Sequence, residues 1–417
     1  MDTPQTMTEA FVRALPKTDL HVHLDGSLRL PTLIELAAER NIQLPSTTEE
    51  GMCDLVFKTR YNDLGEYLHG FMYTCAVMQD AEALERVAYE LAWDNINEGV
   101  RYIEPRFAPQ LHVSDRLDLP TVMLSVHRGF KRAKDEFNRS EAVTLHGEPP
   151  FEYGIIICAM RMFSEGFSQY YAQLLRSHPY SARKRVYAMA SLELAQATVA
   201  IKREYGLPIV GFDLAGQENG FPAEDHIEAY QFAHKHFLKK TVHAGEAYGP
   251  ESIFQAITDL HADRIGHGFN LLSPWLIHDD KTDKQRYISD LSEYIADRRI
   301  TLEVCITSNL QTMPNLKTIH HHAFGDFLER RLSVTFCTDN RLVSNTTVTQ
   351  ELLLAIEAFK MTPSDVKHCL IYGFKRSFFP RPYIEKRHYV RNIIDYYESI
   401  ERKFGIETDD HTEEEGS

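Results

Sequence analysis

Eight short apolar, β-branched segments alternate along this chain with longer stretches of helical periodicity. Each segment is followed by polar or glycine-containing residues, a pattern typical of a parallel sheet whose strands are joined by crossover helices. Eight such strands are the number that closes a TIM-type barrel. The segments are Asp19–Leu24, Arg101–Phe107, Tyr153–Met160, Ile209–Leu214, Lys240–His243, Arg264–His267, Thr301–Ile306 and Ser333–Thr338. We therefore predict an α/β protein built on a (β/α)8 barrel.

The intervals between these segments predict one domain with one large insertion. The interval from Leu24 to Arg101 is far longer than a crossover needs and is rich in aromatic residues. We expect a helical insertion there, after the first strand, that covers the barrel mouth. No repeat or Gly/Ser linker divides the chain. Residues 1–405 are thus expected to form a single barrel domain, and the acidic residues 406–417 to form a disordered tail.

Helical spacing of apolar residues predicts three further elements. Glu82–Glu98 ends before a glycine, Glu251–Leu260 is opened by a proline, and Tyr383–Phe404 is expected to pack on the outside of the barrel. A helical stretch is also expected within Leu272–Arg299.

Composition excludes several classes of function. The formal net charge is −15, and nucleic-acid affinity depends on Lys and Arg contacts to phosphates, so we expect a small-molecule substrate and no nucleic-acid partner. The six cysteines are widely spaced, with no Cys-x-x-Cys pair, as in a reduced protein. No apolar segment resembles a secretory signal or a membrane span, so we expect a cytoplasmic protein with no membrane partner. The sequence leaves the oligomeric state open.

Two histidines occupy alternate positions at the end of the first predicted strand. In Asp19-Leu-His-Val-His-Leu-Asp25 the pleat places His21 and His23 on one face of that strand. Imidazole is the commonest protein ligand for zinc, and barrel active sites lie at the carboxyl ends of the strands. The alternative is a pair of histidines that serves only the surface or the core.

Later strand ends carry polar groups that would open onto the same barrel mouth. They are His243-Ala-Gly-Glu246, Gly266-His267-Gly268 and Cys337-Thr-Asp339-Asn340. Three histidines and a carboxylate form a zinc site with a position left for water, whose pKa the metal lowers toward about 7. Glu246, three residues beyond His243, could move protons beside that site; alternatively it is an acid at a helix start.

Other metal chemistries fit less well. A two-metal amidohydrolase usually carries a bridging carboxylate or modified lysine after its fourth strand, but Gly211–Gly216 contains no lysine, which favours one metal ion per chain. The zinc nucleobase deaminases with a Pro-Cys-x-x-Cys signature are a different class of zinc enzyme. This chain has no such cysteine pair, so it does not fit that class. The run His320–His322 is interpreted as a surface feature beside a helix.

Taken in order, these motifs resemble the adenosine deaminase family over about residues 15 to 360. The resemblance implies that His21, His23, His243 and Asp339 bind Zn²⁺, that Glu246 is the proton shuttle and that His267 orients the metal-activated water. It also implies three substrate contacts: from Asp25 to the ribose 5′-hydroxyl, from the Gly216 backbone to purine N3, and from residue 340 to purine N7. The implied reaction is hydrolytic deamination of adenosine and 2′-deoxyadenosine to inosine and 2′-deoxyinosine, with ammonia as the other product.

The sequence departs from the family pattern at three places. The usual Asp-Asp-Pro is Asp339-Asn340-Arg341, the common Cys-Pro-x-Ser is Cys305-Ile-Thr-Ser308, and Leu272–Arg299 is longer than usual. Asn340 still supplies a donor to N7. The alternatives left open are deamination of another 6-aminopurine (adenine, AMP or a modified adenosine) and a catalytically silent, purine-binding barrel. Arg341 is a candidate for contacting a phosphate.

Overall fold

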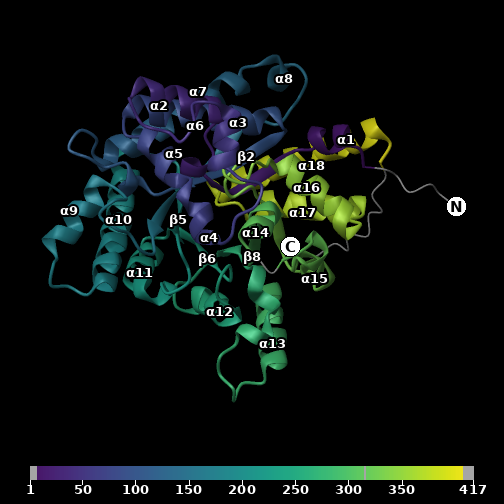
Figure 1. Cartoon of the computed structure of the whole chain (residues 1–417). Coiled ribbons are helices and arrows are strands. Elements are labelled where there is room, and N and C mark those ends of the chain that lie inside the picture. The colour runs from purple at the N-terminus through teal and green to yellow at the C-terminus, as the bar shows by residue number, and fades with distance from the viewer. Residues whose placement is uncertain (1–6, 314–315, 407–417) are drawn as a thin grey trace.

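The computed structural model describes residues 7–313 and 316–406, and its strands form the predicted barrel. Neighbouring strands pair in parallel in the order β1-β2-β4-β5-β6-β7-β8-β9, with helices around them (Figure 1). The strands are β1 Lys17–His23, β2 Val100–Phe107, β4 Ile155–Met160, β5 Ile209–Ala215, β6 Lys239–Ala244, β7 Arg264–His267, β8 Thr301–Val304 and β9 Val334–Phe336. Each falls on one of the eight predicted segments, which confirms the fold class.

The third predicted segment is divided in two. A short strand β3 (Glu152–Tyr153) pairs with β2, and β4 begins only after Gly154. A Cβ at Gly154 would lie 2.6 Å from a methyl group of Val210 and 2.8 Å from the hydroxyl of Tyr102. Side chains of two other strands therefore fill the space beside the break.

The first and last strands meet at one short bridge. Val22 of β1 pairs with Asp339, just beyond β9. The backbone N–H of His23 donates to the Asp339 carbonyl at 2.7 Å, and the N–H of Asp339 donates to the His21 carbonyl at 2.8 Å. The bridge that joins the two ends of the sheet thus involves three residues predicted to bind metal.

The helices surround the strands (Figure 1). They are α1 Glu9–Ala14, α2 Leu30–Glu39, α3 Glu49–Leu55, α4 Leu64–His69, α5 Phe71–Val77, α6 Ala81–Asn97, α7 Leu119–Asn138, α8 Glu141–Thr144, α9 Gln169–Ser177, α10 Arg183–Tyr205, α11 Ile227–Lys235, α12 Pro250–Thr258, α13 Lys284–Asp297, α14 Ile306–Thr312, α15 Phe324–Glu329, α16 Val348–Phe359, α17 Pro363–Arg376 and α18 Tyr383–Phe404. None of these described helices is long and apolar enough to cross a membrane. The expected acidic tail lies outside the described residues from residue 407 onward.

The predicted helices form with small changes at their ends. Helix α6 begins one residue earlier than predicted because the Asp80 side chain caps it by accepting the N–H of Ala83. It packs against α7, where Gly129 lets the two backbones approach closely. Helix α18 has the predicted bounds.

Two segments lengthen the loops of the barrel. The insertion after β1 folds into α2 to α5, and α4 and α5 line the cavity at the barrel mouth, as expected. The second segment, Leu272–Arg299, contains one short turn at Pro274–Leu276 and then α13. Helix α13 projects from the rest of the molecule together with the loop before it (Figure 1).

Candidate metal and active site

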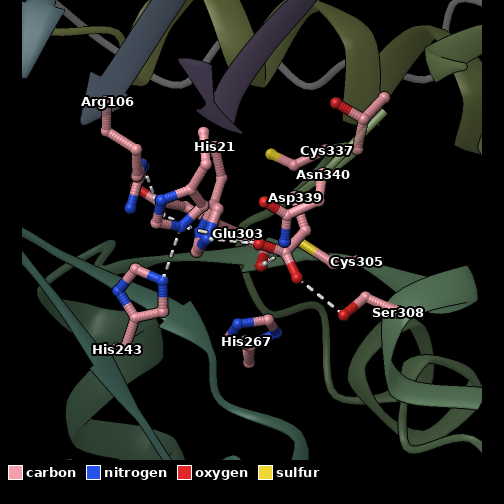
Figure 2. A network of polar contacts seen from close by, with 12 residues as sticks. His21, Arg106, His243, His267, Glu303, Cys305, Ser308, Cys337, Asp339 and Asn340 are labelled. Atoms are coloured by element: carbon pink, nitrogen blue, oxygen red, sulfur yellow. Dashed lines mark hydrogen bonds and ion pairs between the residues drawn. The ribbon is translucent and has the colours of Figure 1, made fainter. Parts of the chain in front are cut away.

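Four buried side chains converge at the carboxyl ends of the strands. Ligand atoms of His21, His23, His243 and Asp339 lie within 4.8 Å of one another. Figure 2 shows His21, His243 and Asp339 among the residues of this cluster. Three imidazoles and one carboxylate are a donor set that suits a divalent transition metal. The structure thus brings together the four residues predicted to bind the metal.

Local backbone geometry explains why these side chains meet. His21 and His23 project from the same face of β1, and His243 lies on β6. Asp339 follows β9 with a φ of 57°, and His267 ends β7 with a φ of 61°. Few residues other than glycine adopt this left-handed conformation, and it is enriched at functional sites.

Two buried carboxylates orient the imidazoles. Nδ1 of His21 lies 2.8 Å from Oε2 of Glu303, and Nδ1 of His243 lies 3.2 Å from Oδ1 of Asp213. A carboxylate accepts the Nδ1–H of an imidazole, which leaves the Nε2 lone pair for a metal. Nε2 of His21 is buried and has no hydrogen-bond partner in the described part of the chain, which fits this role.

Arg106 connects the two orienting carboxylates. Its guanidinium donates to Asp213 and to Glu303, each at 2.8 Å. Burial raises the pKa of Asp213, but the charges of His243 and Arg106 outweigh it and hold that pKa well below its usual range. Burial also raises the pKa of Glu303, but the charges of Arg106 and Arg264 outweigh it and hold that pKa well below its usual range. Both groups are therefore ionised acceptors.

Sequence reasoning missed these three residues. Asp213, Glu303 and Arg106 each lie within a strand whose residues are all buried. A charged residue flanked by apolar residues of a barrel strand faces the barrel interior or a paired charge, because an unpaired buried charge is costly. That signal was present in each of the three strands.

Asp339 faces both histidines of β1. Its Oδ1 lies 3.5 Å from Nε2 of His21 and 3.5 Å from Nε2 of His23. Its Oδ2 accepts hydrogen bonds from Ser308 at 2.6 Å and from Tyr67 at 3.4 Å. Burial opposes ionisation, but the surrounding histidines lower the pKa of Asp339.

Glu246 lies beside this cluster on a tightly turned loop. Gly245 has a φ of 74°, and Oε2 of Glu246 lies 3.9 Å from Nε2 of His267. Burial, reinforced by the charge of Asp339, raises the pKa of Glu246 to about 8. A carboxyl that keeps its proton at neutral pH can act as a general acid.

The loop that carries Glu246 is fixed by a carboxylate from another loop. Glu218, which follows β5, is buried. Its two oxygens accept the backbone N–H groups of residues 245–248 at 2.6 to 3.1 Å and the Ser252 hydroxyl at 2.8 Å. Sequence reasoning did not single out this residue.

His267 is held from behind by a chain of side chains. Its Nδ1 lies 3.3 Å from Nδ2 of Asn309, whose Oδ1 lies 3.1 Å from Nε2 of His322. The prediction that the run His320–His322 is a surface feature holds for the first two residues, which are exposed, but is wrong for His322. His322 is buried and also accepts the backbone N–H of Phe324, so it packs inward behind the site.

The three predicted substrate-binding residues all line one cavity, of about 750 Å³. Oδ1 of Asp25 is buried and has no hydrogen-bond partner among the described residues, and burial raises the pKa of this carboxyl to about 7. Gly216 has a φ of 99°, which favours glycine. Asn340 donates from Nδ2 to the hydroxyl of Tyr67 at 2.7 Å.

Much of the remaining cavity wall is apolar. It includes side chains of the insertion and of the loop after β4, among them Leu68, Met72, Met162 and Phe167. Among the described residues that line the cavity, none is Lys or Arg. Arg341 does not line it, because its guanidinium pairs with Glu98.

Comparison with known proteins identifies a matching family and similar sequences. The family model described as adenosine deaminase matches residues 16–184 and 180–396. Adenosine deaminase 1 of Streptomyces coelicolor is 34% identical over 375 residues, which cover 88% of this chain and 84% of that protein. An adenosine deaminase of Mycobacterium sp. (strain JLS) is 35% identical over 387 residues, covering 91% and 94%.

Solved structures share the fold at lower identity. Adenine deaminase from Arthrobacter aurescens superposes with a TM-score of 0.72 at 20% identity, over 92% of this chain and 99% of that one. An Arabidopsis N6-mAMP deaminase gives 0.70 at 23% identity, over 93% and 99%. An amidohydrolase from Burkholderia ambifaria, solved with bound Zn, gives 0.73 at 18% identity, over 98% and 97%.

Proposed function

This chain belongs to the adenosine deaminase family, and from that premise we propose that its cavity converts adenosine and 2′-deoxyadenosine with water to inosine or 2′-deoxyinosine and ammonia. The protein is a hydrolase that acts on a cyclic amidine C–N bond. The observation that carries this function is the convergence of three imidazoles and Asp339 next to a buried Glu246.

We propose Zn²⁺ as the metal, one ion per chain, held by His21, His23, His243 and Asp339. Imidazole nitrogens oriented by carboxylates suit zinc, and Nε2 of His21 has no hydrogen-bond partner among the described residues. Bound there, the ion would supply the Lewis-acid chemistry that makes a water nucleophilic near neutral pH.

The protein's own side chains perform the proton transfers. Protonated Glu246 donates to N1 of the purine, which breaks the ring conjugation and makes C6 accept the oxygen of water. His267 and Asp339 hold that water and accept the proton that it releases as its oxygen bonds to C6. The amino group then receives this proton and leaves as ammonia, and the proton of the new C6 hydroxyl returns to Glu246, so that one water is consumed for each C–N bond broken.

The lining of the cavity favours a nucleoside over a nucleotide. A phosphate is bound by Arg, Lys or several backbone N–H groups. The described lining contains no basic residue except histidines, it contains the carboxyl of Asp25, and Arg341 is occupied by Glu98. Oδ1 of Asp25, which has no hydrogen-bond partner among the described residues, instead suits a ribose hydroxyl, which free adenine lacks. A silent purine-binding barrel is disfavoured because the ligand set and Glu246 are both in place.

Two further parts of the proposal concern the whole chain. We propose that residues 1–405 form one domain, because α1 packs against α16 and α18, and α18 packs against α17, which contacts β1 and β9. We place the protein in the cytoplasm, because all six cysteines are free, as a reducing compartment would keep them.

Metal analysis and an ammonia-release screen test the function together. The purified protein should contain about one zinc per chain. It should release ammonia from adenosine and 2′-deoxyadenosine far faster than from adenine or AMP. AMP as the best substrate would show that a phosphate site exists elsewhere in the cavity, and zinc with no ammonia from any purine would show a binding protein.

A further inference from the structure

Tyr67 brings a hydroxyl of the insertion into the centre of the candidate site. It lies on α4 and is buried, and its ring, like Asn340, lines the cavity. Its oxygen lies 2.7 Å from Nδ2 of Asn340, 2.7 Å from the hydroxyl of Ser344 and 3.4 Å from Oδ2 of Asp339. A residue of the first insertion thus contacts residues that follow the last strand.

The hydrogens at this junction can be assigned by counting donors. A phenol has one hydrogen, and an amide nitrogen has two. Nδ2 of Asn340 gives one hydrogen to the Tyr67 oxygen, and the Tyr67 hydrogen goes on to Ser344 or Asp339. The second N–H of Asn340 therefore stays available to the cavity that this residue lines.

A second contact fixes which way the amide of Asn340 faces. Its Oδ1 is packed so closely against Gly26 that a Cβ at Gly26 would lie only 1.9 Å away. The described part of the chain offers this oxygen no hydrogen-bond partner. Gly26 on one side and Tyr67 on the other therefore hold the amide plane in one orientation.

We propose that Tyr67 is a positioning residue for purine recognition: it anchors Asn340 so that the second N–H of the amide donates to N7 of the bound 6-aminopurine. The pairing uses both hydrogens of the amide that stands at residue 340 in place of the family's usual acid. A carboxylic acid carries a single proton and could not donate both to Tyr67 and to N7, whereas an amide can. This inference rests on the proposed purine substrate.

Comparison of adenosine with 7-deazaadenosine, which has a C–H in place of N7, tests the role of Tyr67. Leaving a buried donor unpaired costs the native protein roughly 5- to 150-fold in kcat/KM for the deaza substrate. The ratio of the two kcat/KM values cancels any loss that affects both substrates, including one transmitted through Asp339. We expect Tyr67→Phe to lower this ratio, Asn340→Ala to bring it near one, and Tyr67→Phe to change nothing further in the Asn340→Ala background.

Tyr61→Phe is the matched control. Tyr61 belongs to the same insertion, its ring lies 5.1 Å from that of Tyr67, and its buried hydroxyl donates to the Val343 carbonyl at 2.9 Å without touching Asn340. This variant should keep the native ratio. Two results would overturn the inference. One is a native ratio of the two kcat/KM values in Tyr67→Phe. The other is that Tyr67→Phe changes this ratio equally with and without the Asn340 side chain.

Binding of inosine and 7-deazainosine, measured by calorimetry, gives the same comparison without turnover. Their Kd ratio should follow the kinetic ratio through all four variants. A protein that releases no ammonia but still discriminates between these ligands through Tyr67 would refute the deaminase proposal and support this inference. An active deaminase in which Tyr67→Phe leaves the substrate ratio unchanged would support the deaminase proposal and refute this inference.

Discussion

The carboxylate of Glu218 accepts the backbone N–H of Glu246 at 3.1 Å, although the two residues follow different strands. The same carboxylate takes the three neighbouring N–H groups of that loop. Gly216, the proposed contact to purine N3, lies two residues before Glu218. One side chain therefore fixes the distance between the proposed purine contact and the proposed proton donor.

We expect Glu218→Gln to lower kcat on adenosine by about 100-fold, since a misplacement of about 1 Å in a reacting group costs that much. The amide would turn an N–H toward backbone N–H groups. Metal content and KM should stay close to native. Steady-state kinetics with metal analysis would check this, and Glu224→Gln, a change of an exposed acid that accepts from Gln255, is the control. A native kcat in Glu218→Gln would refute the positioning role.

The rate should depend on pH through Glu246. The pKa of this carboxyl is raised to about 8, and a general acid acts in its protonated form, so kcat/KM should fall as pH rises through that pKa. A bound cation would stabilise the carboxylate, so the decline should begin no higher than about pH 8. Glu246→Gln should retain metal, lose about 10²- to 10⁴-fold in rate and lack this alkaline limb. An unchanged limb in the variant would assign it to another group.

Loss of the orienting carboxylates should weaken metal binding without abolishing it. Asp213→Asn and Glu303→Gln should each reduce zinc affinity about 10- to 100-fold, the usual effect of removing a partner behind a ligand. His243→Ala, which removes a ligand itself, should cost more. Competition with a chromogenic chelator measures all three. Native affinity in both orienting variants would show that the imidazoles are held by packing alone.

Asp25 should distinguish a nucleoside from a free base. Asp25→Ala should lower kcat/KM on adenosine roughly 10- to 150-fold, because the variant loses a hydrogen bond to a charged or polar group. Any slow reaction with adenine should be unaffected, since the base has no hydroxyl to contact. Equal losses on the two substrates would show that Asp25 instead supports the metal site. Its Oδ1 lies 3.9 Å from Nδ1 of His23.

The contact between α6 and α7 should not tolerate a side chain at Gly129. A Cβ there would lie 2.3 Å from the Glu85 carbonyl oxygen and 2.7 Å from the Cβ of Ala88. Alanine gains about 1 kcal/mol of helix propensity, but a clash with backbone cannot be relieved by rotating a side chain. Gly129→Ala should lower the free energy of unfolding by about 1–3 kcal/mol and leave kcat unchanged. A denaturant titration that shows equal or greater stability would contradict this.

The sequence alone was sufficient for the barrel, because its strands and helices follow from short-range periodicity. The same periodicity paired His21 with His23, whereas His243 and Asp339 joined the predicted metal ligands through the strand-end motifs and the family resemblance. Alternation along β1 placed His21 and His23 together, and helical spacing predicted α18 with its observed bounds. Periodicity carries no information about which distant strands touch, so the pairing of Glu303 with His21 could not be derived. The same limit hid the contact between Tyr67 and Asn340 and the inward packing of His322.

The bridge between β1 and Asp339 has a consequence for how the protein is made. A ribosome adding about 5–20 residues per second needs roughly 16 to 64 s to progress from His21 to Asp339. During that time the nascent chain contains His21 and His23 but not yet the carboxylate of Asp339. The hydrogen bonds between the Asp339 backbone and its neighbours on β1 form as the last strand docks. The fourth proposed ligand therefore arrives with the final strand. A metal ion that reaches the chain earlier would find an incomplete ligand set, and one that arrives after docking would find a complete one.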